Sequence, residues 1–139
     1  MEEMLQKEGN AQCCPVAAIV RNGTILIGLR HYTPDKWKAI SVWTLPGGRC
    51  DVGETIEQTL RREVAEETAI CSLTIDKFLG EVPGAKDGDR VPVFLCSASE
   101  EPVVVEIEKF SEWKWCPITE LPDNFINPHA KELILKEYT

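Results

Sequence analysis

Three glutamates within five residues, Glu63, Glu66 and Glu67, lie in a segment whose pattern predicts a helix over residues 55–69. Like charges three or four positions apart on a helix repel one another. Three apolar residues form the stripe of this helix that would face a sheet: Ile56, Leu60 and Val64. At about 100° per residue, Glu67 falls within that stripe, Glu63 at its margin and Glu66 on its flank. The predicted helix therefore brings carboxylates to the face on which it packs.

A carboxylate that faces a core is costly unless it is paired, protonated or bound to a cation. Arg62 can reach Glu66 at the next turn, but one arginine does not balance three carboxylates. A hard divalent cation such as Mg²⁺ does, because it takes oxygen ligands and is usually held by one or two carboxylates together with substrate phosphates. Taken from the helix alone, a salt-bridged helix without metal stays an alternative interpretation.

The loop before this helix contains Gly47, Gly48 and Gly53. Glycine lets a backbone approach a ligand closely, and the exposed amides at a helix start favour anions. Thr55 and Gln58 fit a capping box, which predicts that the helix starts at Thr55. For the Gly-Gly pair by itself, a plain turn is the alternative.

Elsewhere the sequence predicts short strands joined by hairpins. Asn22-Gly23 between the apolar runs 15–20 and 24–30 is typical of a tight hairpin turn. Further strands are expected at residues 42–45, 72–82, 91–97 and 112–116, a weaker one at 103–107, a helical turn at 117–121 and a final helix from Asn127 and Pro128. This mixture, without a regular βαβ rhythm, predicts the α/β class, with a mixed sheet and helices on its faces.

Composition limits the organisation and the partners of the chain. Its 139 residues, 43% of them hydrophobic, suit a single domain over residues 1–139, with residues 1–12 expected to form a loose arm. The net charge of −8 argues against a nucleic-acid polymer or an anionic membrane as partner. It does not argue against a small anionic substrate, since a bound metal can invert the local field.

Cysteine usage and the N-terminus indicate the compartment. The six cysteines show no C-x-x-C spacing and only two histidines accompany them, so a zinc site is poorly supported. The first ten residues, MEEMLQKEGN, are polar, and no signal peptide or membrane span is visible. We expect a cytoplasmic protein with reduced thiols.

The glycine loop and the acidic helix together match one longer pattern. Gly48 is followed after five residues by Glu54, and after seven more by REVAEETAI at residues 62–70. This resembles the Nudix box: Gly, five residues, Glu, seven residues, then Arg-Glu-aliphatic-any-Glu-Glu-any-Gly-aliphatic. Only Ala69 departs from it, where the family has Gly. Glycine there would serve a left-handed helix exit, so alanine costs on the order of 1 kcal/mol, with the carboxylates and the expected activity untouched.

Other segments resemble the same family over most of residues 14–138. They are ILIGLR, VWTLPGG and IEKFSEWKWCPITELP, which are similar to its second strand, its approach to the box, and its closing strand and short helix. The resemblance implies a Nudix-type α/β/α sandwich, a mixed sheet flanked by helices.

The resemblance also implies an activity. Nudix hydrolases use Mg²⁺ or Mn²⁺ to cleave the pyrophosphate bond of a nucleoside diphosphate linked to another group. Carried over by position, the metal-site and catalytic carboxylates are Glu63, Glu66 and Glu67. The Gly47 carbonyl is an expected further ligand, Arg62 orients the glutamates, and Glu54 supports the junction between loop and helix.

The catalytic base and the substrate contacts stay less defined. The base is either Glu63 or a glutamate from a later loop, with five candidates: Glu100, Glu101, Glu106, Glu108 and Glu112. Arg30, Arg49 and Gly48 are expected to bind substrate phosphates, with surface salt bridges as the alternative for the arginines. Trp113 and Trp115 share a face, so at least one is expected in the core.

The substrate class is argued mainly from missing features. Motifs associated with NADH-type and coenzyme A-type members are absent, and Lys86 stands where dinucleotide-polyphosphate hydrolases usually carry Tyr. The resemblance therefore favours a MutT-like nucleoside triphosphate diphosphatase. An ADP-ribose or nucleotide-sugar pyrophosphatase is the alternative enzyme, and a non-catalytic nucleotide sensor is the alternative of another class. A homodimer is kept as an alternative to a monomer.

Overall fold

The computed structural model of the chain describes residues 1–31 and 41–139, so Trp37 and most of the loop 31–41 lie outside the described residues. The elements, in chain order, are α1 (Glu2–Leu5), β1 (Val16–Arg21), β2 (Thr24–Arg30), β3 (Val42–Thr44), α2 (Ile56–Thr68), β4 (Thr74–Pro83), β5 (Arg90–Ser97), β6 (Phe110–Pro117), the 3₁₀ turn η1 (Ile118–Glu120) and α3 (Pro128–Glu137). Each main predicted strand and helix is present; residues 103–107, the weaker strand candidate, form none.

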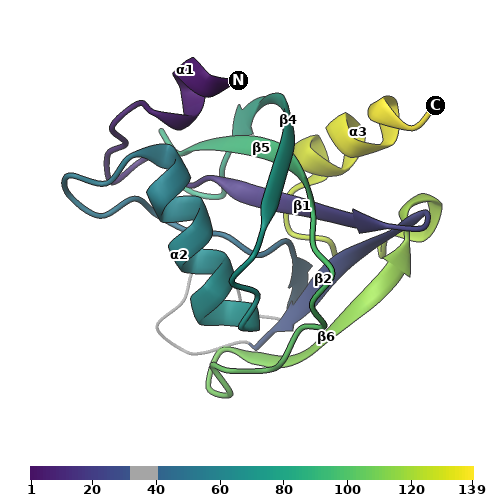
Figure 1. The fold of residues 1–139 in the computed structure, drawn as a ribbon. Helices are drawn as coiled ribbons and strands as arrows, with labels where there is room; N and C mark the ends of the chain where they lie inside the picture. The colour runs from purple at the N-terminus through teal and green to yellow at the C-terminus, as the bar shows by residue number, and fades with distance from the viewer. Residues whose placement is uncertain (32–40) are drawn as a thin grey trace.

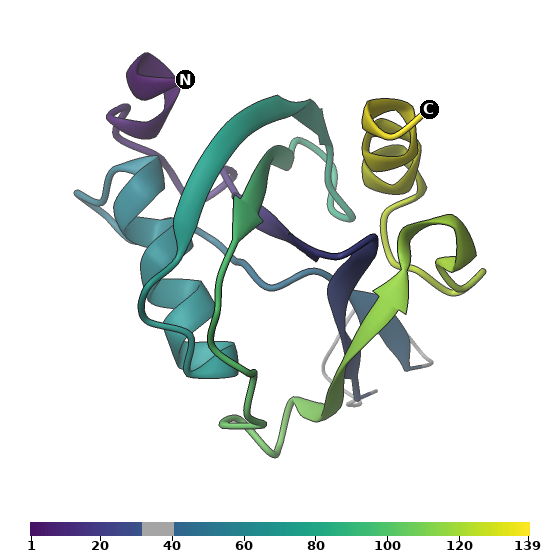
Figure 2. The ribbon, with the colours of Figure 1, turned by 45° about the vertical axis from the view of Figure 1, so that its right-hand side comes forward.

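The strands form one mixed sheet in the order β3-β2-β1-β5-β4, with β6 paired to β2 (Figure 1). β1 and β5 run parallel and the other pairs antiparallel. Helix α2 covers one face of the sheet and α3 lies on the other side, as Figure 2 shows from a second direction. This arrangement confirms the predicted α/β class and the Nudix-type sandwich.

The β1–β2 hairpin turns at the predicted dipeptide. Asn22 has a φ of 50° and Gly23 a φ of 77°, and tight hairpin turns of this kind need a positive φ at both positions. The turn sets the pairing of Val20 with Ile25, which places the apolar residues of both strands in the two cores.

The sheet separates two hydrophobic cores. On one side, Leu60 and Val64 of α2 are fully buried against residues that include Phe94. On the other, Ala130 and Ile134 of α3 are buried in a second cluster. Each helix is thus held by its apolar stripe, which fixes the orientation of α2 and of the glutamates on it.

Residues 1–12, expected to be a loose arm, instead lie against the start of α2. Leu5 is buried in the core beneath α2, the Gly9 N–H donates to the Glu54 carbonyl at 2.9 Å, and the Ile56 N–H donates to the Lys7 carbonyl at 2.9 Å. Met4 also packs against this core, so two apolar residues hold a segment whose composition is mainly polar. Across the described ranges, no helix is both long and apolar enough to cross a bilayer.

Helix α2 begins and ends as its sequence predicts. Thr55 and Gln58 make both hydrogen bonds of the capping box. Ala69 follows the last helical residue with a φ of 66°, the left-handed conformation in which the Nudix box has glycine.

Ala69→Gly is therefore expected to stabilise the protein. Alanine in the left-handed region costs about 1 kcal/mol, and glycine removes that strain. The melting temperature should rise by about 2–5 °C with turnover unchanged, measured by thermal unfolding and a hydrolysis assay. Ala65→Gly, in the middle of the same helix, is the control and should destabilise by about 1 kcal/mol. A lower melting temperature for Ala69→Gly would contradict the strain argument.

Candidate active site

Glu63, Glu66 and Glu67 of helix α2 lie in three different environments. Glu67 faces the core with only 4% of its surface exposed. The side chain of Glu63 is 18% exposed, and that of Glu66 is 48% exposed. This order of burial is the one that the helical positions predict, and it leaves Glu67 as a buried carboxylate inside the protein.

Glu67 is held by two hydrogen bonds. Its Oε1 accepts the Gly47 N–H at 3.0 Å, and its backbone carbonyl accepts the indole N–H of Trp113 at 3.1 Å. The pKa of the Glu67 carboxyl is raised to about 8, mainly by burial and also by the charges of Glu63 and Glu106, while the hydrogen bond from Gly47 and the charge of Arg30 act in the opposite direction. Among residues 1–31 and 41–139, no cationic side chain forms an ion pair with this buried carboxylate.

The two glycines of the loop bring its backbone against these carboxylates. A Cβ on Gly48 would lie 2.6 Å from the Glu63 carboxyl carbon. A Cβ on Gly47, whose φ is 152°, would clash with the Pro15 carbonyl. Gly47 therefore requires glycine, because backbone atoms of Pro15 and Val16 leave no space for a side chain. At Gly48 an added Cβ would displace the Glu63 carboxylate.

Arg62 connects the loop to the helix. Its Nε and Nη2 donate to the Glu54 carboxylate at 2.7 and 2.9 Å. Its Nη1 lies 3.0 Å from Glu63 and 3.1 Å from Glu66. The hydrogen bonds from Arg62 hold the pKa of Glu54 at about 2, with the Asp51 N–H and the Thr59 hydroxyl contributing. Arg62 thereby fixes the carboxylates' relative positions.

Replacing Glu54 by glutamine is expected to give a pH-dependent loss of stability. Because the folded-state pKa of Glu54 is about 2 against an ordinary 4.5, its stabilisation is present above pH 4.5 and is lost as the pH falls toward 2. The variant should be less stable by about 2 kcal/mol at pH 7, and the gap should shrink below pH 4.5.

Denaturant unfolding of both proteins at several pH values measures this gap. Glu2→Gln, at an exposed position of α1, is the control and should show no such dependence. A gap that is constant from pH 7 to pH 3 would mean that the ion pair with Arg62 is not its source.

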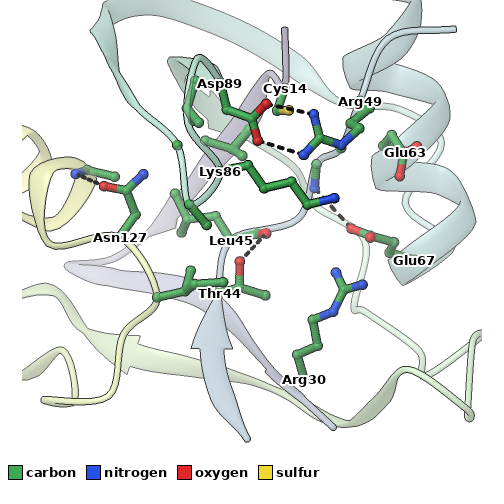
Figure 3. A pocket seen from close by; sticks show the side chains of 18 of the residues that line it. Cys14, Arg30, Thr44, Leu45, Arg49, Glu63, Glu67, Lys86, Asp89 and Asn127 are labelled. Atoms are coloured by element: carbon green, nitrogen blue, oxygen red, sulfur yellow. Dashed lines mark hydrogen bonds and ion pairs between the residues drawn. The ribbon is translucent and has the colours of Figure 1, made fainter. Parts of the chain in front are cut away.

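Gly47, Gly48, Glu63 and Glu67 contribute one wall of a pocket of about 630 Å³, which Glu66 and Arg62 do not line (Figure 3). Glu63 and Glu67 lie at one end, and Arg30 and Lys86 extend into the pocket near them. The far end is largely apolar, with four such lining residues: Leu45, Phe125, Ile126 and Ala130. Such a pocket offers charge of both signs for a polyphosphate and an apolar space for a base.

The two arginines expected to bind phosphate differ in their surroundings. Arg30 lines the pocket, and its charge lowers the pKa of Glu67. Arg49 also lines it, but its guanidinium donates two hydrogen bonds to Asp89, at 2.9 and 2.6 Å, and a third to the Ala11 carbonyl at 2.7 Å. Arg30 thus faces the pocket, whereas the guanidinium of Arg49 is hydrogen-bonded to Asp89.

The comparisons with known proteins decide the family. A family model described as the NUDIX domain matches residues 15–136. The chain belongs to the Nudix family. Nudix hydrolases act on small nucleotide substrates and generally use divalent metal ions.

The individual relatives belong to the same family, but their names give different activities. The NAD-capped RNA hydrolase NudC of Haemophilus influenzae is 31% identical over 117 residues, which cover 78% of this chain and 42% of that protein. This chain therefore spans less than half the length of such relatives. The MutT NUDIX hydrolase of Burkholderia pseudomallei is 30% identical in its crystal structure, with a TM-score of 0.69 and coverage of 92% of this chain and 98% of that one. An ADP-ribose pyrophosphatase of Streptococcus suis shares the fold at 19% identity, with a TM-score of 0.71 and coverage of 93% and 92%.

The five later glutamates considered as the catalytic base have different surroundings. Glu100 accepts the N–H groups of Cys71 and Ser72. Glu101 pairs with Arg21 and accepts from the Trp115 indole. Glu108 and Glu112 are exposed. The fifth, Glu106, pairs with Lys109 at 3.5 Å and acts on the pKa of Glu67, so it is the later glutamate whose charge reaches the Nudix carboxylates.

The tryptophan expectation is confirmed, since Trp113 and Trp115 both pack against the core beneath α2. Trp43 is 9% exposed and belongs to the other core. Phe125, which the sequence did not single out, lines the apolar end of the pocket.

Sequence reasoning also missed pocket residues that lie far from the Nudix box: Cys14, Lys86, Asp89, Lys109 and Asn127. Four of them lie in predicted loops or at element ends, where charge alone does not distinguish a site from a solvated surface. A usable signal existed for one: Asn127 was predicted as a helix cap, and the start of α3 does border the pocket.

The glutamate carboxylates of the Nudix box are suitable ligands for a divalent cation, although they do not form a complete coordination shell. In the described part of the chain, no three His, Cys, Asp or Glu side chains are arranged to hold a metal ion. Glu67 is buried, Glu63 is partly buried, and the charge of Glu63 acts on Glu67. Arg62 contacts both Glu63 and Glu66, so Glu67 is the carboxylate of the three that Arg62 does not reach. Two oxygen-donating carboxylates with open space beside them match how Mg²⁺ binds when substrate phosphates supply further ligands.

Proposed function

We propose that this Nudix hydrolase cleaves a nucleoside triphosphate between its α and β phosphates, with Mg²⁺ or Mn²⁺, to give a nucleoside monophosphate and pyrophosphate. The observation that carries the proposal is the composition of one pocket. The partly buried Glu63 and the buried Glu67 lie near the cations Arg30 and Lys86, and the opposite end is apolar. A polyphosphate joined to a nucleoside has the complementary distribution of charge and apolar surface.

We assign the metal to the carboxylates of the Nudix box. Glu63 and Glu67 would hold it, with Glu66 and the Gly47 carbonyl as further oxygen donors. When bound, Mg²⁺ or Mn²⁺ neutralises charge that develops on phosphate oxygens and lowers the pKa of water. The burial of Glu67 supports the assignment, because the charge of this carboxylate is poorly solvated without a cation.

The chain's own residues supply position and proton transfer. Arg30 would hold phosphate oxygens near Glu67, and Arg62 keeps Glu63 and Glu66 in place. In the reaction a water oxygen attacks phosphorus, the bond to the bridging oxygen breaks, and pyrophosphate leaves. The proton from water passes to Glu63 or Glu106, the two glutamates whose charges act on the Nudix site. The rate should then rise with pH as the base loses its proton.

A second candidate substrate is a dinucleotide cap. The sequence relationship to NAD-capped RNA hydrolases favours it, since that substrate contains a pyrophosphate between two nucleosides. It requires space for a second nucleoside beside the pocket. ADP-ribose is the third substrate to compare, and a nucleotide that binds without turnover would support the sensor alternative.

The test is a panel of nucleoside triphosphates, NAD, NAD-capped RNA and ADP-ribose, assayed with and without Mg²⁺ or Mn²⁺. Release of pyrophosphate and nucleoside monophosphate from a triphosphate, and only with metal, is expected. Hydrolysis in ¹⁸O water, followed by mass spectrometry, identifies the phosphorus attacked. Release of inorganic phosphate and nucleoside diphosphate without pyrophosphate would overturn the proposal, and cleavage of NAD-capped RNA or ADP-ribose alone would promote that alternative.

A further inference from the structure

We propose that Lys86 binds the terminal phosphates of the substrate, and that the Arg49–Asp89 ion pair holds the loop that carries Lys86 against the Nudix loop. This inference rests on the proposed function and extends it. It makes the β4–β5 loop a specificity element that favours a pyrophosphate leaving group over a sugar phosphate.

The β4–β5 loop, residues 84–89, has a defined shape. The Gly84 N–H donates to the Asp89 carbonyl and the Asp89 N–H donates to the Lys86 carbonyl, both at 3.0 Å. Gly88 provides the positive φ, 84°, that this turn requires. Lys86 thus lies in a turn that is closed by backbone hydrogen bonds.

The ion pair joins this turn to the loop that contains the Nudix glycines. The Asp89 side chain is 7% exposed and accepts both hydrogen bonds from Arg49. The Arg49 side chain is 41% exposed, so the pair is buried on the Asp89 side only. Its two parallel hydrogen bonds fix the relative geometry of the two side chains better than a single solvated contact does. These hydrogen bonds also lower the pKa of Asp89 and raise that of Arg49. The pair therefore acts as a brace between two loops that border the same pocket.

The Arg49–Asp89 ion pair also affects which cationic side chains are free to bind a phosphate. The charge of Arg49 is paired with that of Asp89, which makes Arg49 a weaker candidate for a phosphate contact. Lys86 makes no ion pair with any described residue, and its ammonium extends across the pocket on the side where Glu67 and Arg30 lie (Figure 3). An unpaired cation over a pocket is a point charge suited to phosphate.

The leaving group explains why this position should affect specificity. Pyrophosphate leaves with more negative charge than a sugar phosphate, because it has two phosphoryl groups and no esterified sugar. A cation that contacts its outer phosphate stabilises a triphosphate substrate and has nothing equivalent to contact on ADP-ribose. Lys86 is thus expected to act on the ratio of kcat/KM for the two substrates.

The experiment compares Lys86→Gln, Lys86→Arg and the matched control Lys136→Gln, which removes an exposed charge at the far end of α3. Lys86→Gln should raise the KM for nucleoside triphosphate by about 10- to 100-fold, with kcat changed much less. Lys86→Arg should restore most of the affinity, and Lys136→Gln should behave as the wild type. An equal loss toward triphosphate and ADP-ribose, or an unchanged KM, would overturn the role of Lys86.

Binding of inorganic pyrophosphate with Mg²⁺, measured by calorimetry, separates this inference from the proposed function. If the wild type fails to cleave triphosphates, the proposed function fails, yet weaker pyrophosphate binding by Lys86→Gln than by Lys136→Gln still supports the phosphate contact. Equal binding by the two variants overturns it.

The brace is tested by Asp89→Asn and, in case that variant folds poorly, by Arg49→Gln. Each should raise the KM for triphosphate while Lys86 is intact. Adding Lys86→Gln to either should then cost little more, because both changes remove one contact. Fully additive effects on KM would show that the brace does not position Lys86.

Discussion

Glu67→Gln is expected to abolish turnover and, at the same time, to stabilise the protein without metal. The buried carboxylate is the proposed metal ligand most enclosed by the protein, so a neutral amide should lower kcat by a factor on the order of 10³ or more. The amide keeps an oxygen that can accept the Gly47 N–H, and it removes a poorly solvated charge from the core. Activity and stability should therefore change in opposite directions.

The stability gain of Glu67→Gln over the wild type should increase with pH. Since the folded-state pKa of Glu67 is about 8 against an ordinary 4.5, the folded protein holds a proton that the unfolded chain releases between these values. Wild-type stability then falls from pH 4.5 to pH 8 through this group, and the advantage of Glu67→Gln grows over the same range. Thermal unfolding in a chelator, at pH 5 and at pH 8, measures it.

Glu57→Gln is the matched control for Glu67→Gln. Glu57 lies on the same helix and pairs with Arg61, away from the pocket. Its replacement should leave kcat unchanged and lower stability by less than about 1 kcal/mol. Near-normal turnover by Glu67→Gln, measured with Mg²⁺ and with Mn²⁺, would show that the metal assignment is wrong.

The parts of the fold that the sequence predicted are those determined locally. Asn22-Gly23 has the turn geometry that the dipeptide favours, and Thr55 with Gln58 makes the capping box. The burial order of the three glutamates followed from helical geometry alone, because one apolar stripe decides which side of a helix faces the sheet. Each of these depends on residues close together in the chain.

The parts that the sequence did not predict depend on distant contacts. β1 pairs with β5 in parallel across more than half of the chain, and nothing in either strand specifies that partner. The Arg49–Asp89 pair joins positions 40 residues apart, and neither residue by itself indicates the other as its partner. Arg49 was therefore predicted as a phosphate ligand, and Asp89 was not singled out. The carboxylates that we propose as metal ligands could be named from the Nudix box, but the opposite wall of the pocket required the tertiary fold.

Gly47→Ala is expected to cause the largest loss of stability of the substitutions considered, together with loss of turnover. The residue has a φ of 152°, and an added Cβ would clash with the Pro15 carbonyl and lie 2.7 Å from the Val16 Cα, both backbone atoms of β1 or its approach. Because neither can yield without moving a strand, the cost should be about 3 kcal/mol or more. The same shift would displace the Gly47 N–H from Glu67.

Gly53→Ala separates backbone strain from this collision. Gly53 lies in the same loop with a φ of 84°, but an added Cβ there would meet nothing within 4 Å. It should cost only about 1 kcal/mol, as strain alone does, and should keep most of the activity. Denaturant unfolding and a hydrolysis assay on both variants make the comparison. If the two alanines destabilise the protein equally, the contact between Gly47 and β1 is not what fixes the Nudix loop, and the placement of Glu67 must then depend on α2 alone.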